Sequence, residues 1–372
     1  MRNIIVIGAG ILGASTAYHL AKLGANVTLV DRHDRGQATD AAAGIVCPWL
    51  SQRRNKAWYQ LVKGGARYYP SLISELEAVG EKDTGYSRVG AICLHTDLDK
   101  LEKMAERARK RREDAPEIGE ITILSPAETK KMFPLLSEEY GSVYVSGGAR
   151  VNGRALRNAL INSAIKNGAV FLQGDASLLH TNNRVTGIKL GKTSLNADQV
   201  IVTAGVWAKE LLQPLGVHFS VTSQKAQIVH LEMPNRDTSH WPVVMPPNDQ
   251  YILTLGEGRI VIGATHEDDA GQDYRVTVGG LNEVLGKAMA VAPGLAECTM
   301  VETRVGFRPF TPGFLPVIGA LPNFEGILLA NGLGASGLTS GPYLGSELAK
   351  LALGKETEID LSFYDVAGSI EK

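Results

Sequence analysis

Residues 4–13, IIVIGAGILG, and residues 26–31, NVTLVD, decide the fold of this chain. Four branched aliphatic residues in a row predict a strand buried on both faces, and a Gly-x-Gly-x-x-Gly pattern follows where a helix must begin. The first glycine permits a tight turn, the second lets a pyrophosphate approach the backbone, and the third lets helix and strand pack closely. Asp31 ends the second strand, where a carboxylate can accept hydrogen bonds from an adenosine ribose. The stretch predicts a dinucleotide-binding βαβ unit and leaves open whether the ligand is FAD or NAD.

Length, composition and charge favour a two-domain protein that binds a small molecule. The 372 residues exceed the usual size of one domain, and 44% of them are hydrophobic. The formal net charge of -1 gives no general attraction to nucleic acid or to anionic lipid. The dense basic run at 107–112 continues a segment with a helical apolar period. We therefore expect the solvated face of a helix there rather than a nucleic-acid site.

The cysteines and histidines predict neither disulfides nor a metal site. Cys47, Cys93 and Cys298 are far apart and form no C-x-x-C pair, and the eight histidines show no metal-ligand spacing. No run of about 18 apolar residues offers a membrane span, and the first strand begins too close to Met1 for a signal peptide. We expect a soluble, cytoplasmic protein.

Hydrophobic periodicity and capping residues predict helices and strands along the whole chain. Ser125 with Glu128, and Asn152, are expected to cap helices. Residues 170–172 predict another buried strand, and Pro342 is expected in the first turn of the final helix. The other expected elements are helices at 56–78, 97–112 and 276–291, a meander at 177–195, a strand with a second glycine turn at 197–207, antiparallel strands at 226–231, 251–255, 259–265 and 299–307, and a last buried strand at 327–330.

Together and in this order, these segments resemble the FAD-dependent amino-acid oxidase and dehydrogenase family, which includes glycine oxidase, D-amino-acid oxidase and sarcosine oxidase. The resemblance covers most of the chain and is loose at residues 50–140. It implies an α/β fold in which a Rossmann-type FAD-binding domain carries an inserted, mainly antiparallel β substrate-binding domain. We expect the first domain at 1–85, 142–218 and 303–372 and the second at 86–141 and 219–302. The specific parts of the resemblance are residues 8–13 with Asp31, residues 39–44, Thr203-Ala204-Gly205-x-Trp207, Gly306-Phe307-Arg308-Pro309 and residues 334–339.

The resemblance also implies a non-covalent FAD. Sarcosine oxidase-like members attach flavin through a cysteine two residues before the position of Arg308, where this chain has Gly306. The last glycine turn is expected to bring a helix N-terminus to the flavin N1 and C2 carbonyl edge, where its dipole favours negative charge. The residues expected to contact FAD, besides Arg308, are Gly8, Ala9, Gly10, Ile11, Leu12, Gly13, Asp31, Arg32, Thr39, Ala42, Ala43, Gly44, Asp175, Ala176, Thr203, Ala204, Gly205, Trp207, Gly334, Ala335, Ser336, Gly337, Leu338 and Thr339.

Two residues are expected at the substrate. In glycine oxidase-like members an arginine in the setting of Arg308 binds the substrate carboxylate, and a guanidinium offers two parallel donors for it. Tyr251 is expected to give a second hydrogen bond to that carboxylate. The alternatives are a surface cation–π contact for Arg308 and an ordinary core position for Tyr251. Val261 stands where sarcosine oxidase-like members hold an oxygen-activating lysine, so we expect slow reaction with oxygen.

The resemblance predicts an enzyme that oxidises a small amino acid by hydride transfer from the carbon bearing nitrogen to flavin N5. Glycine, D-amino acids and N-methyl amino acids are the candidate substrates. The electron acceptor stays open among oxygen, quinone and other compounds, as does assembly into a homo-oligomer. One alternative is a flavin-dependent 2-hydroxy-acid dehydrogenase, which needs a base for the hydroxyl proton, and His266 is the candidate. Another is a flavin-bearing subunit of a larger dehydrogenase complex.

Overall fold

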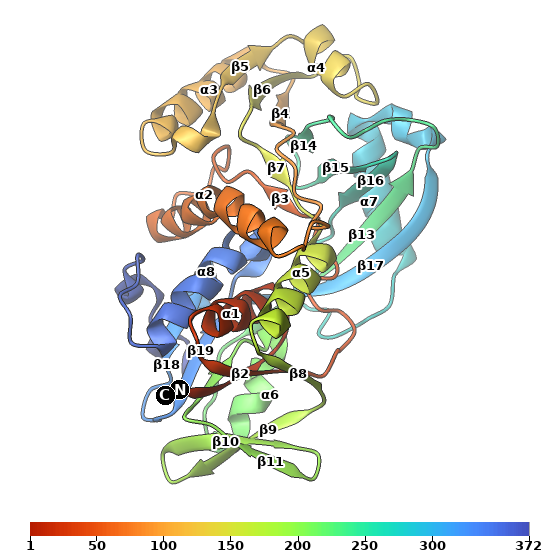
Figure 1. The fold of residues 1–372 in the computed structure, drawn as a ribbon. Coiled ribbons are helices and arrows are strands. Elements are labelled where there is room, and N and C mark those ends of the chain that lie inside the picture. The colour runs from red at the N-terminus through yellow and green to blue at the C-terminus, as the bar shows by residue number, and fades with distance from the viewer. Residues whose placement is uncertain (372) are drawn as a thin grey trace.

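The computed structural model describes residues 1–371 and contains two large β-sheets, of six and eight strands, with helices packed around them (Figure 1). The first sheet has six strands in the order β18-β19-β12-β1-β2-β8. All neighbours are parallel except β18 and β19, which are antiparallel. Its strands are β1 (Asn3–Ile7), β2 (Asn26–Asp31), β8 (Val170–Gln173), β12 (Gln199–Val202), β18 (Val317–Ala320) and β19 (Ile327–Asn331).

Residues Ile4–Ile7 of β1 are all aliphatic, and they are buried on both faces of the sheet. Ile4 and Val6 pack into one hydrophobic core, whereas Ile5 and Ile7 pack into a second core on the opposite face. This alternation is the two-residue period of a strand. The pattern at residues 4–7 thus predicted both the strand and its place in the middle of the sheet.

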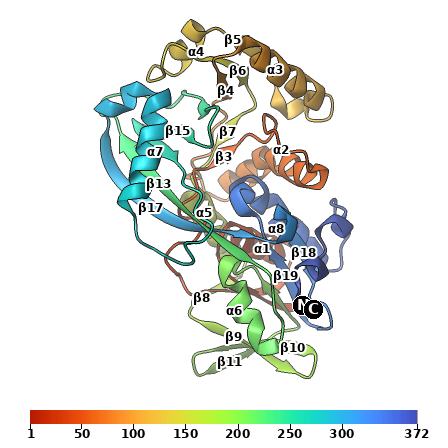
Figure 2. The ribbon, with the colours of Figure 1, turned by 180° about the vertical axis from the view of Figure 1, so that it is seen from behind.

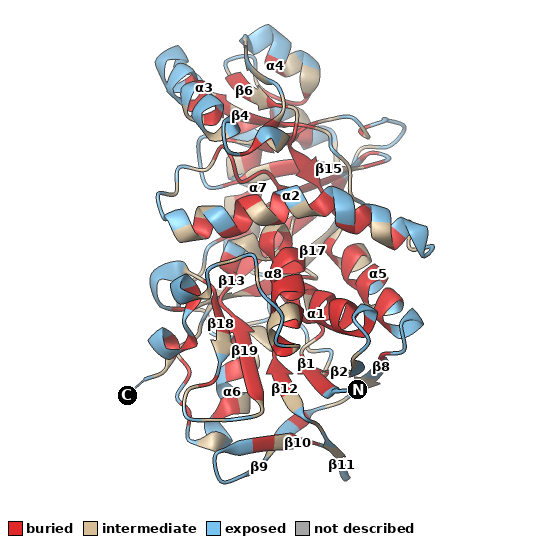
Figure 3. Ribbon diagram, turned by 60° about the vertical axis from the view of Figure 1, so that its left-hand side comes forward, coloured by how far each residue is buried: buried red, intermediate tan, exposed pale blue. Residues whose placement is uncertain are grey.

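Helices cover one face of this sheet, and a small meander with one short helix covers the other (Figure 1). Figure 3 shows that α1 and α8, which lie side by side, are among the most completely buried helices. The helices of the first face are α1 (Ile11–Lys22), α2 (Lys56–Ala78), α5 (Gly153–Lys166) and α8 (Gly337–Ala352). The opposite face carries β9 (Ala176–Thr181), β10 (Arg184–Leu190), β11 (Thr193–Asn196) and α6 (Ala208–Leu212).

The second sheet joins two segments that are far apart in the sequence. Its eight strands are in the order β17-β13-β16-β15-β14-β4-β6-β5, and all neighbours are antiparallel except β14 and β4. Helix α7 (Val278–Val291) packs on β13 and β16, while α3 (Leu98–Arg112) and α4 (Pro126–Met132) lie at the β5–β6 end (Figure 2). The domain boundaries expected at 141/142 and 302/303 fall inside β6 and β17. The strands are β4 (Ala91–His95), β5 (Ile121–Leu124), β6 (Gly141–Val145), β13 (Thr222–Glu232), β14 (Val243–Met245), β15 (Tyr251–Gly256), β16 (Arg259–Gly263) and β17 (Thr299–Phe310).

The predicted helix caps are confirmed. The Ser125 side chain accepts a hydrogen bond from the Glu128 backbone N–H, and the Glu128 carboxylate accepts one from the Ser125 N–H. Asn152 Oδ1 accepts a hydrogen bond from the Ala155 N–H at the start of α5. The helices predicted at 56–78, 97–112 and 276–291 are α2, α3 and α7.

Two details differ from the sequence predictions. The strand predicted at 170–172 exists, but its burial was wrong: β8 is an edge strand, and Val170 and Phe171 are 50% and 36% exposed. The first-turn position expected for Pro342 is also wrong, because α8 begins at Gly337. A proline inside a helix leaves the carbonyl four residues earlier without its N–H donor. The Tyr69 hydroxyl donates to that carbonyl, on Leu338, at 2.5 Å.

Three further observations apply to residues 1–371. None of the helices is long and apolar enough to cross a membrane. No group of three or more His, Cys, Asp or Glu side chains is placed so that it could hold a metal ion. Cys47, Cys93 and Cys298 are free thiols.

Candidate active site

An elongated cavity of about 640 Å³ extends from the ends of β1 and β2 to β15 and β17. Its volume is typical of ligand sites, which measure roughly 300–1,000 Å³. Four of the residues expected to contact FAD do not line it: Ala9, Gly13, Ser336 and Thr339. The expected residues that do line it are Gly8, Gly10, Ile11, Leu12, Asp31, Arg32, Thr39, Ala42, Ala43, Gly44, Asp175, Ala176, Thr203, Ala204, Gly205, Trp207, Tyr251, Arg308, Gly334, Ala335, Gly337 and Leu338.

The glycine turn after β1 brings the N-terminus of α1 to the cavity. Gly8 has a φ of 101°, and a Cβ atom there would lie 2.6 Å from the Thr203 carbonyl oxygen. A Cβ atom on Gly13 would lie 1.8 Å from the Gly8 carbonyl oxygen, so Gly13 permits close packing behind the cavity wall. Residues 10–12 line the cavity, where the partial positive charge of a helix N-terminus favours a phosphate.

Asp31 lines the cavity and also holds the glycine turn. Its Oδ2 accepts a hydrogen bond from the Ala9 N–H at 2.6 Å. Its Oδ1 accepts from the His33 N–H at 2.5 Å and from Gln37 Nε2 at 2.8 Å. Because a carboxylate has about four acceptor positions, one is left for a ribose hydroxyl. Ala9 therefore acts through Asp31 rather than at the cavity surface.

Arg32 lies among carboxylates at the same end of the cavity. Its guanidinium is 2.8 Å from Asp34, 3.4 Å from Asp175 and 4.0 Å from Glu210. An arginine at this position accommodates the 2′-phosphate of NADP in related dinucleotide folds. Here the carboxylates already neutralise the guanidinium, which disfavours a ligand with an additional phosphate.

Small residues at 41–44 form a wall against which a flat ring system can lie. Gly44 has a φ of 92°, and a Cβ atom there would lie 1.8 Å from the Val151 carbonyl oxygen. Next to this wall, Thr39 Oγ1 accepts a hydrogen bond from the Ile11 N–H at 3.0 Å. Thr39 thereby ties the small-residue segment to the first turn of α1.

The last glycine turn brings a second helix N-terminus to the cavity, because Gly334, Ala335, Gly337 and Leu338 line it. The two hydroxyl side chains of this turn are directed elsewhere. Ser336 Oγ accepts a hydrogen bond from Trp58 Nε1 at 2.9 Å, and Thr339 Oγ1 donates to the Ile45 carbonyl at 2.9 Å. Their side chains fix α2 and β3 (Ile45–Val46) to this turn instead of lining the cavity.

Asn331 is a cavity residue that the sequence patterns did not indicate. It is 2% exposed and ends β19, with Nδ2 donating to the Gly205 carbonyl at 2.9 Å. Its Oδ1 accepts a hydrogen bond from the Gly332 N–H at 2.7 Å. Asn331 therefore joins the glycine turn after β12 to the turn before α8. An asparagine directly after a buried aliphatic strand was the available signal.

Arg308 and Tyr251 are brought together at the end of the cavity formed by the second sheet. Arg308 Nη1 donates to Gln224 Oε1 at 2.7 Å and to the Thr265 carbonyl at 3.5 Å. Within residues 1–371, no protein group accepts a hydrogen bond from its Nε or Nη2. Burial raises the pKa of Tyr251 to about 12, although the charge of Arg308 opposes the shift. The hydroxyl is therefore a protonated donor at neutral pH.

His266 and Asp249 line the same end of the cavity. His266 Nδ1 lies 3.5 Å from Asp249 Oδ2, and Lys287 Nζ lies 2.9 Å from Asp249 Oδ1. Burial, followed by the charge of Arg308, lowers the pKa of His266 despite Asp249, so the imidazole is neutral at pH 7. The sequence indicated His266, whereas Asp249 lies in a loop with no distinctive motif.

Val261 does not line the cavity. Val261 is 1% exposed in the hydrophobic core, between His230 of β13 and Leu253 of β15. The side chain that the resemblance matches with an oxygen-activating lysine therefore does not line the cavity of this chain. No lysine is among the cavity-lining residues of the described part of the chain.

A family model described as FAD dependent oxidoreductase matches residues 3–351. The chain belongs to this family. The predictions of the family, of the α/β fold and of FAD as the cofactor are confirmed. The site fits FAD, because two helix N-termini and four glycines of positive φ, Gly8, Gly44, Gly205 and Gly334, line a single elongated cavity.

Three relatives of this FAD-dependent oxidoreductase cover nearly its whole length. It is 67% identical to the uncharacterized oxidoreductase YurR of Bacillus subtilis, with 100% of both chains covered. It is 30% identical to the glycine oxidase of Pseudomonas aeruginosa, with 99% of both chains covered. The crystal structure of iminodiacetate oxidase from Chelativorans sp. BNC1 matches with a TM-score of 0.95 and 45% identity, covering 97% of this chain and 98% of the other.

Proposed function

We propose that this FAD-dependent oxidoreductase oxidises a small amino acid at the carbon that bears nitrogen, a CH–NH or CH–NH2 donor. The observation that carries the proposal is Arg308, which lines the cavity with its Nε and Nη2 donors free of protein acceptors in residues 1–371. Two parallel guanidinium donors suit a carboxylate. The relatives named glycine oxidase and iminodiacetate oxidase support the same substrate class.

Each residue at this end of the cavity has a distinct role in the proposal. Arg308 binds the substrate carboxylate through two hydrogen bonds, and the Tyr251 hydroxyl donates a third. His266, which is neutral, accepts the proton of the substrate ammonium and leaves a lone pair on nitrogen. Bound FAD supplies the two-electron oxidation, while the protein supplies orientation. Water then hydrolyses the imino acid product.

Within this class we propose that N-carboxymethyl amines, such as iminodiacetate and sarcosine, are better substrates than glycine. The support is the higher identity to the iminodiacetate oxidase, 45%, than to the glycine oxidase, 30%. D-Amino acids are also CH–NH2 donors, and D-alanine is therefore compared with these substrates in the titration described below.

For FAD we propose a placement along the cavity. The pyrophosphate lies at residues 10–12, on the N-terminus of α1. The adenosine lies beside Asp31, Arg32 and Ala176, and the isoalloxazine ring lies between residues 42–44 and the turn before α8. All of these residues line one continuous cavity, which supports this order.

We propose that a quinone or another organic acceptor reoxidises the flavin faster than oxygen does. A cation at the flavin stabilises negative charge that develops on oxygen. Among the described lining residues, the arginines and lysines are limited to Arg32, which is paired with carboxylates, and Arg308, which is assigned to the substrate. Comparing dye reduction with peroxide formation tests this, and equal rates would contradict it.

The main experiment is an anaerobic titration of the holoprotein that follows the visible absorbance of the flavin. Iminodiacetate, sarcosine, glycine and D-alanine are compared with the hydroxy acids glycolate and D-lactate. Bleaching by amino acids alone supports the proposal. Bleaching by hydroxy acids alone overturns it.

One observation favours a second candidate, a 2-hydroxy-acid dehydrogenase. The His266–Asp249 pair lines the cavity and can accept a hydroxyl proton, which that reaction requires. The same titration separates the two activities. If the purified chain reduces an artificial acceptor with neither substrate class, a role as a flavin-bearing subunit gains support.

A further inference from the structure

Arg308 is held by a residue from the neighbouring strand rather than by its own. Gln224 of β13 lies directly opposite Arg308 of β17 in the antiparallel register, and its Oε1 accepts a hydrogen bond from Arg308 Nη1 at 2.7 Å. The Thr265 carbonyl, at 3.5 Å, is the other acceptor near Nη1. Both partners contact the same nitrogen, so the edge made by Nε and Nη2 has no protein acceptor within residues 1–371, and Arg308 lines the cavity.

The orientation of the Gln224 amide is fixed from its other end. Its Nε2 donates to Asp268 Oδ1 at 2.7 Å. An amide that meets a guanidinium at one end and a carboxylate at the other has one favourable orientation, with its oxygen toward the cation. Asp268 thus determines which atom of Gln224 faces Arg308.

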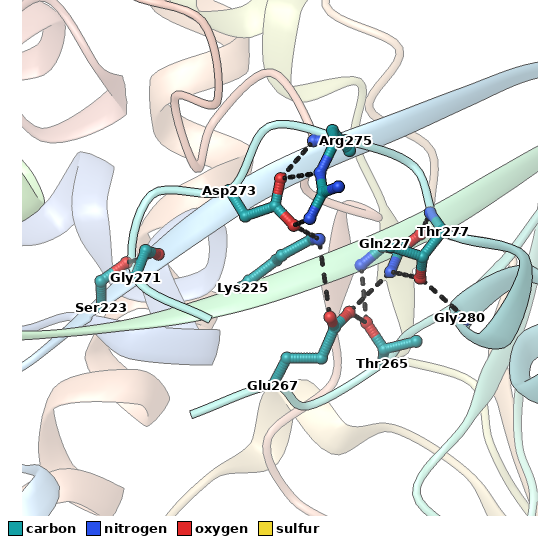
Figure 4. A network of polar contacts seen from close by, with 10 residues as sticks. All are labelled: Ser223, Lys225, Gln227, Thr265, Glu267, Gly271, Asp273, Arg275, Thr277 and Gly280. Carbon is teal, nitrogen blue, oxygen red and sulfur yellow. Dashed lines mark hydrogen bonds and ion pairs between the residues drawn. The ribbon is translucent and has the colours of Figure 1, made fainter. Parts of the chain in front are cut away.

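Asp268 is exposed, but the segment that carries it is anchored in the sheet. Figure 4 shows Lys225 of β13, which is 1% exposed, between Glu267 at 3.6 Å and Asp273 at 3.3 Å. Gln227 Nε2 also donates to Glu267 at 2.7 Å, and Thr265 Oγ1 donates to it at 2.6 Å. Glu267 stands between His266 and Asp268 in the chain, so this network holds both of them in place.

We propose that Gln224 is a positioning residue that fixes the guanidinium of Arg308 and leaves its Nε–Nη2 edge for the substrate carboxylate. This inference rests on the proposed function, in which Arg308 binds that carboxylate. A glutamate in place of Gln224 would neutralise Arg308, whereas an amide accepts the hydrogen bond and leaves the positive charge available. The nearest carboxylate in this chain of contacts, Asp268, is exposed to solvent, which screens its charge.

The test compares two small ligands on the holoprotein, acetate and its neutral isostere acetamide, through their perturbation of the flavin absorbance. Gln224→Met should weaken acetate binding by about tenfold and change acetamide binding by less than about twofold. Gln224→Glu should weaken acetate binding further. Asp268→Asn should bind acetate with nearly the affinity of the wild type, because an amide oxygen can still accept a hydrogen bond from Gln224 Nε2. Gln60→Met, a glutamine change on an exposed part of α2, is the matched control.

Flavin content and melting temperature show whether each variant is folded. If Gln224→Met does not fold, Asp268→Ala replaces it, since it disturbs the amide from an exposed position and should weaken acetate about threefold. Wild-type acetate binding in Gln224→Met, or in Asp268→Ala where it replaces that variant, overturns the positioning role, and so do equal losses of acetate and acetamide binding. The Arg308→Met variant separates the role of Gln224 from the proposed function. If Arg308→Met loses acetate binding while Gln224→Met does not, only the inference about Gln224 fails. If Arg308→Met binds acetate normally, the inference about Gln224 and the proposed carboxylate-binding role of Arg308 both fail.

Discussion

The carboxylate of Asp31 accepts a hydrogen bond from the backbone N–H of Ala9 at 2.6 Å, across the mouth of the glycine turn. The end of β2 is thereby tied to the end of β1, and the residue expected to meet the ribose also shapes the loop expected to meet the pyrophosphate. We therefore expect adenosine binding and loop geometry to depend on one side chain.

We predict that Asp31→Ala weakens FAD binding and also destabilises the apoprotein. The change leaves the buried Ala9 N–H without an acceptor, which costs about 1–3 kcal/mol. Asp31→Asn, which retains one acceptor oxygen, should lose less FAD affinity and less apoprotein stability than Asp31→Ala. Calorimetry of the apoprotein and titration with FAD measure the two effects. An unchanged melting temperature in Asp31→Ala would show that the bond to Ala9 contributes nothing to stability.

Arg308→Met should lower kcat/KM for an amino acid with little change in flavin content. Removing one partner of a buried charged pair costs about 2–5 kcal/mol, which is roughly 30-fold to several-thousand-fold in kcat/KM. Arg308→Lys should recover part of the loss, because a point charge cannot reproduce two parallel donors. The matched control is Arg259→Met, an exposed arginine on β16. Equal losses for an amine without a carboxylate would remove Arg308 from the substrate site.

Tyr251→Phe should weaken carboxylate binding by about tenfold, the value of one hydrogen bond to a charged group. Because burial raises the pKa of Tyr251 to about 12, its hydroxyl stays protonated throughout the neutral and mildly alkaline range. The ratio of wild-type to variant affinity should therefore be constant between about pH 6 and pH 10. Ligand titrations across that range check this, and a ratio that falls as the pH rises would mean that the hydroxyl ionises earlier.

Gly13→Ala should cause loss of flavin and a lower melting temperature. A Cβ atom at this position would lie 1.8 Å from the Gly8 carbonyl oxygen, so helix and turn must move apart. Gly279→Ala in α7 is the control, because a Cβ atom there has no neighbour within 4 Å. Removing a helical glycine should stabilise the protein by about 0.4–1 kcal/mol. Normal flavin content in Gly13→Ala would contradict the packing argument.

The flavin should be released by acid precipitation and remain in the supernatant. Gly306, which the resemblance places where sarcosine oxidase-like members carry the linking cysteine, lines the cavity, and none of the three free cysteines is among the described lining residues. Yellow colour retained in the pellet would show that the linkage is covalent through another residue.

Local signals explain which features were predictable. The turn at Gly8 and the caps at Ser125 and Asn152 depend on residues a few positions apart, so a short window of sequence contains the whole interaction. The exposure of β8 depends on which strands flank it in the sheet, which no local period encodes. The strand β14 was missed because its three residues are too few for a period.

In the candidate site, too, some residues were indicated by the sequence, whereas other contacts depend on how the strands pair. Arg308 and Tyr251 were indicated by a resemblance that assigned both to the substrate. The contact between Arg308 and Gln224 joins residues 84 positions apart, and it exists only because β13 and β17 pair in one particular register. For Val261 the resemblance gave a position along the chain but not the surroundings of the side chain, which is buried away from the cavity.

The two helices whose N-termini reach the cavity come from opposite ends of the chain and lie in direct contact. Ser15 Oγ in α1 donates to the Pro342 carbonyl in α8 at 2.7 Å, and Gly345 packs against Ser15. During synthesis, α1 is made more than 300 residues before α8. The cavity therefore stays incomplete until both helices have been made and have packed together. We expect a chain that ends before α8 to bind FAD weakly or not at all, because one of the two helix N-termini at the cavity is then absent.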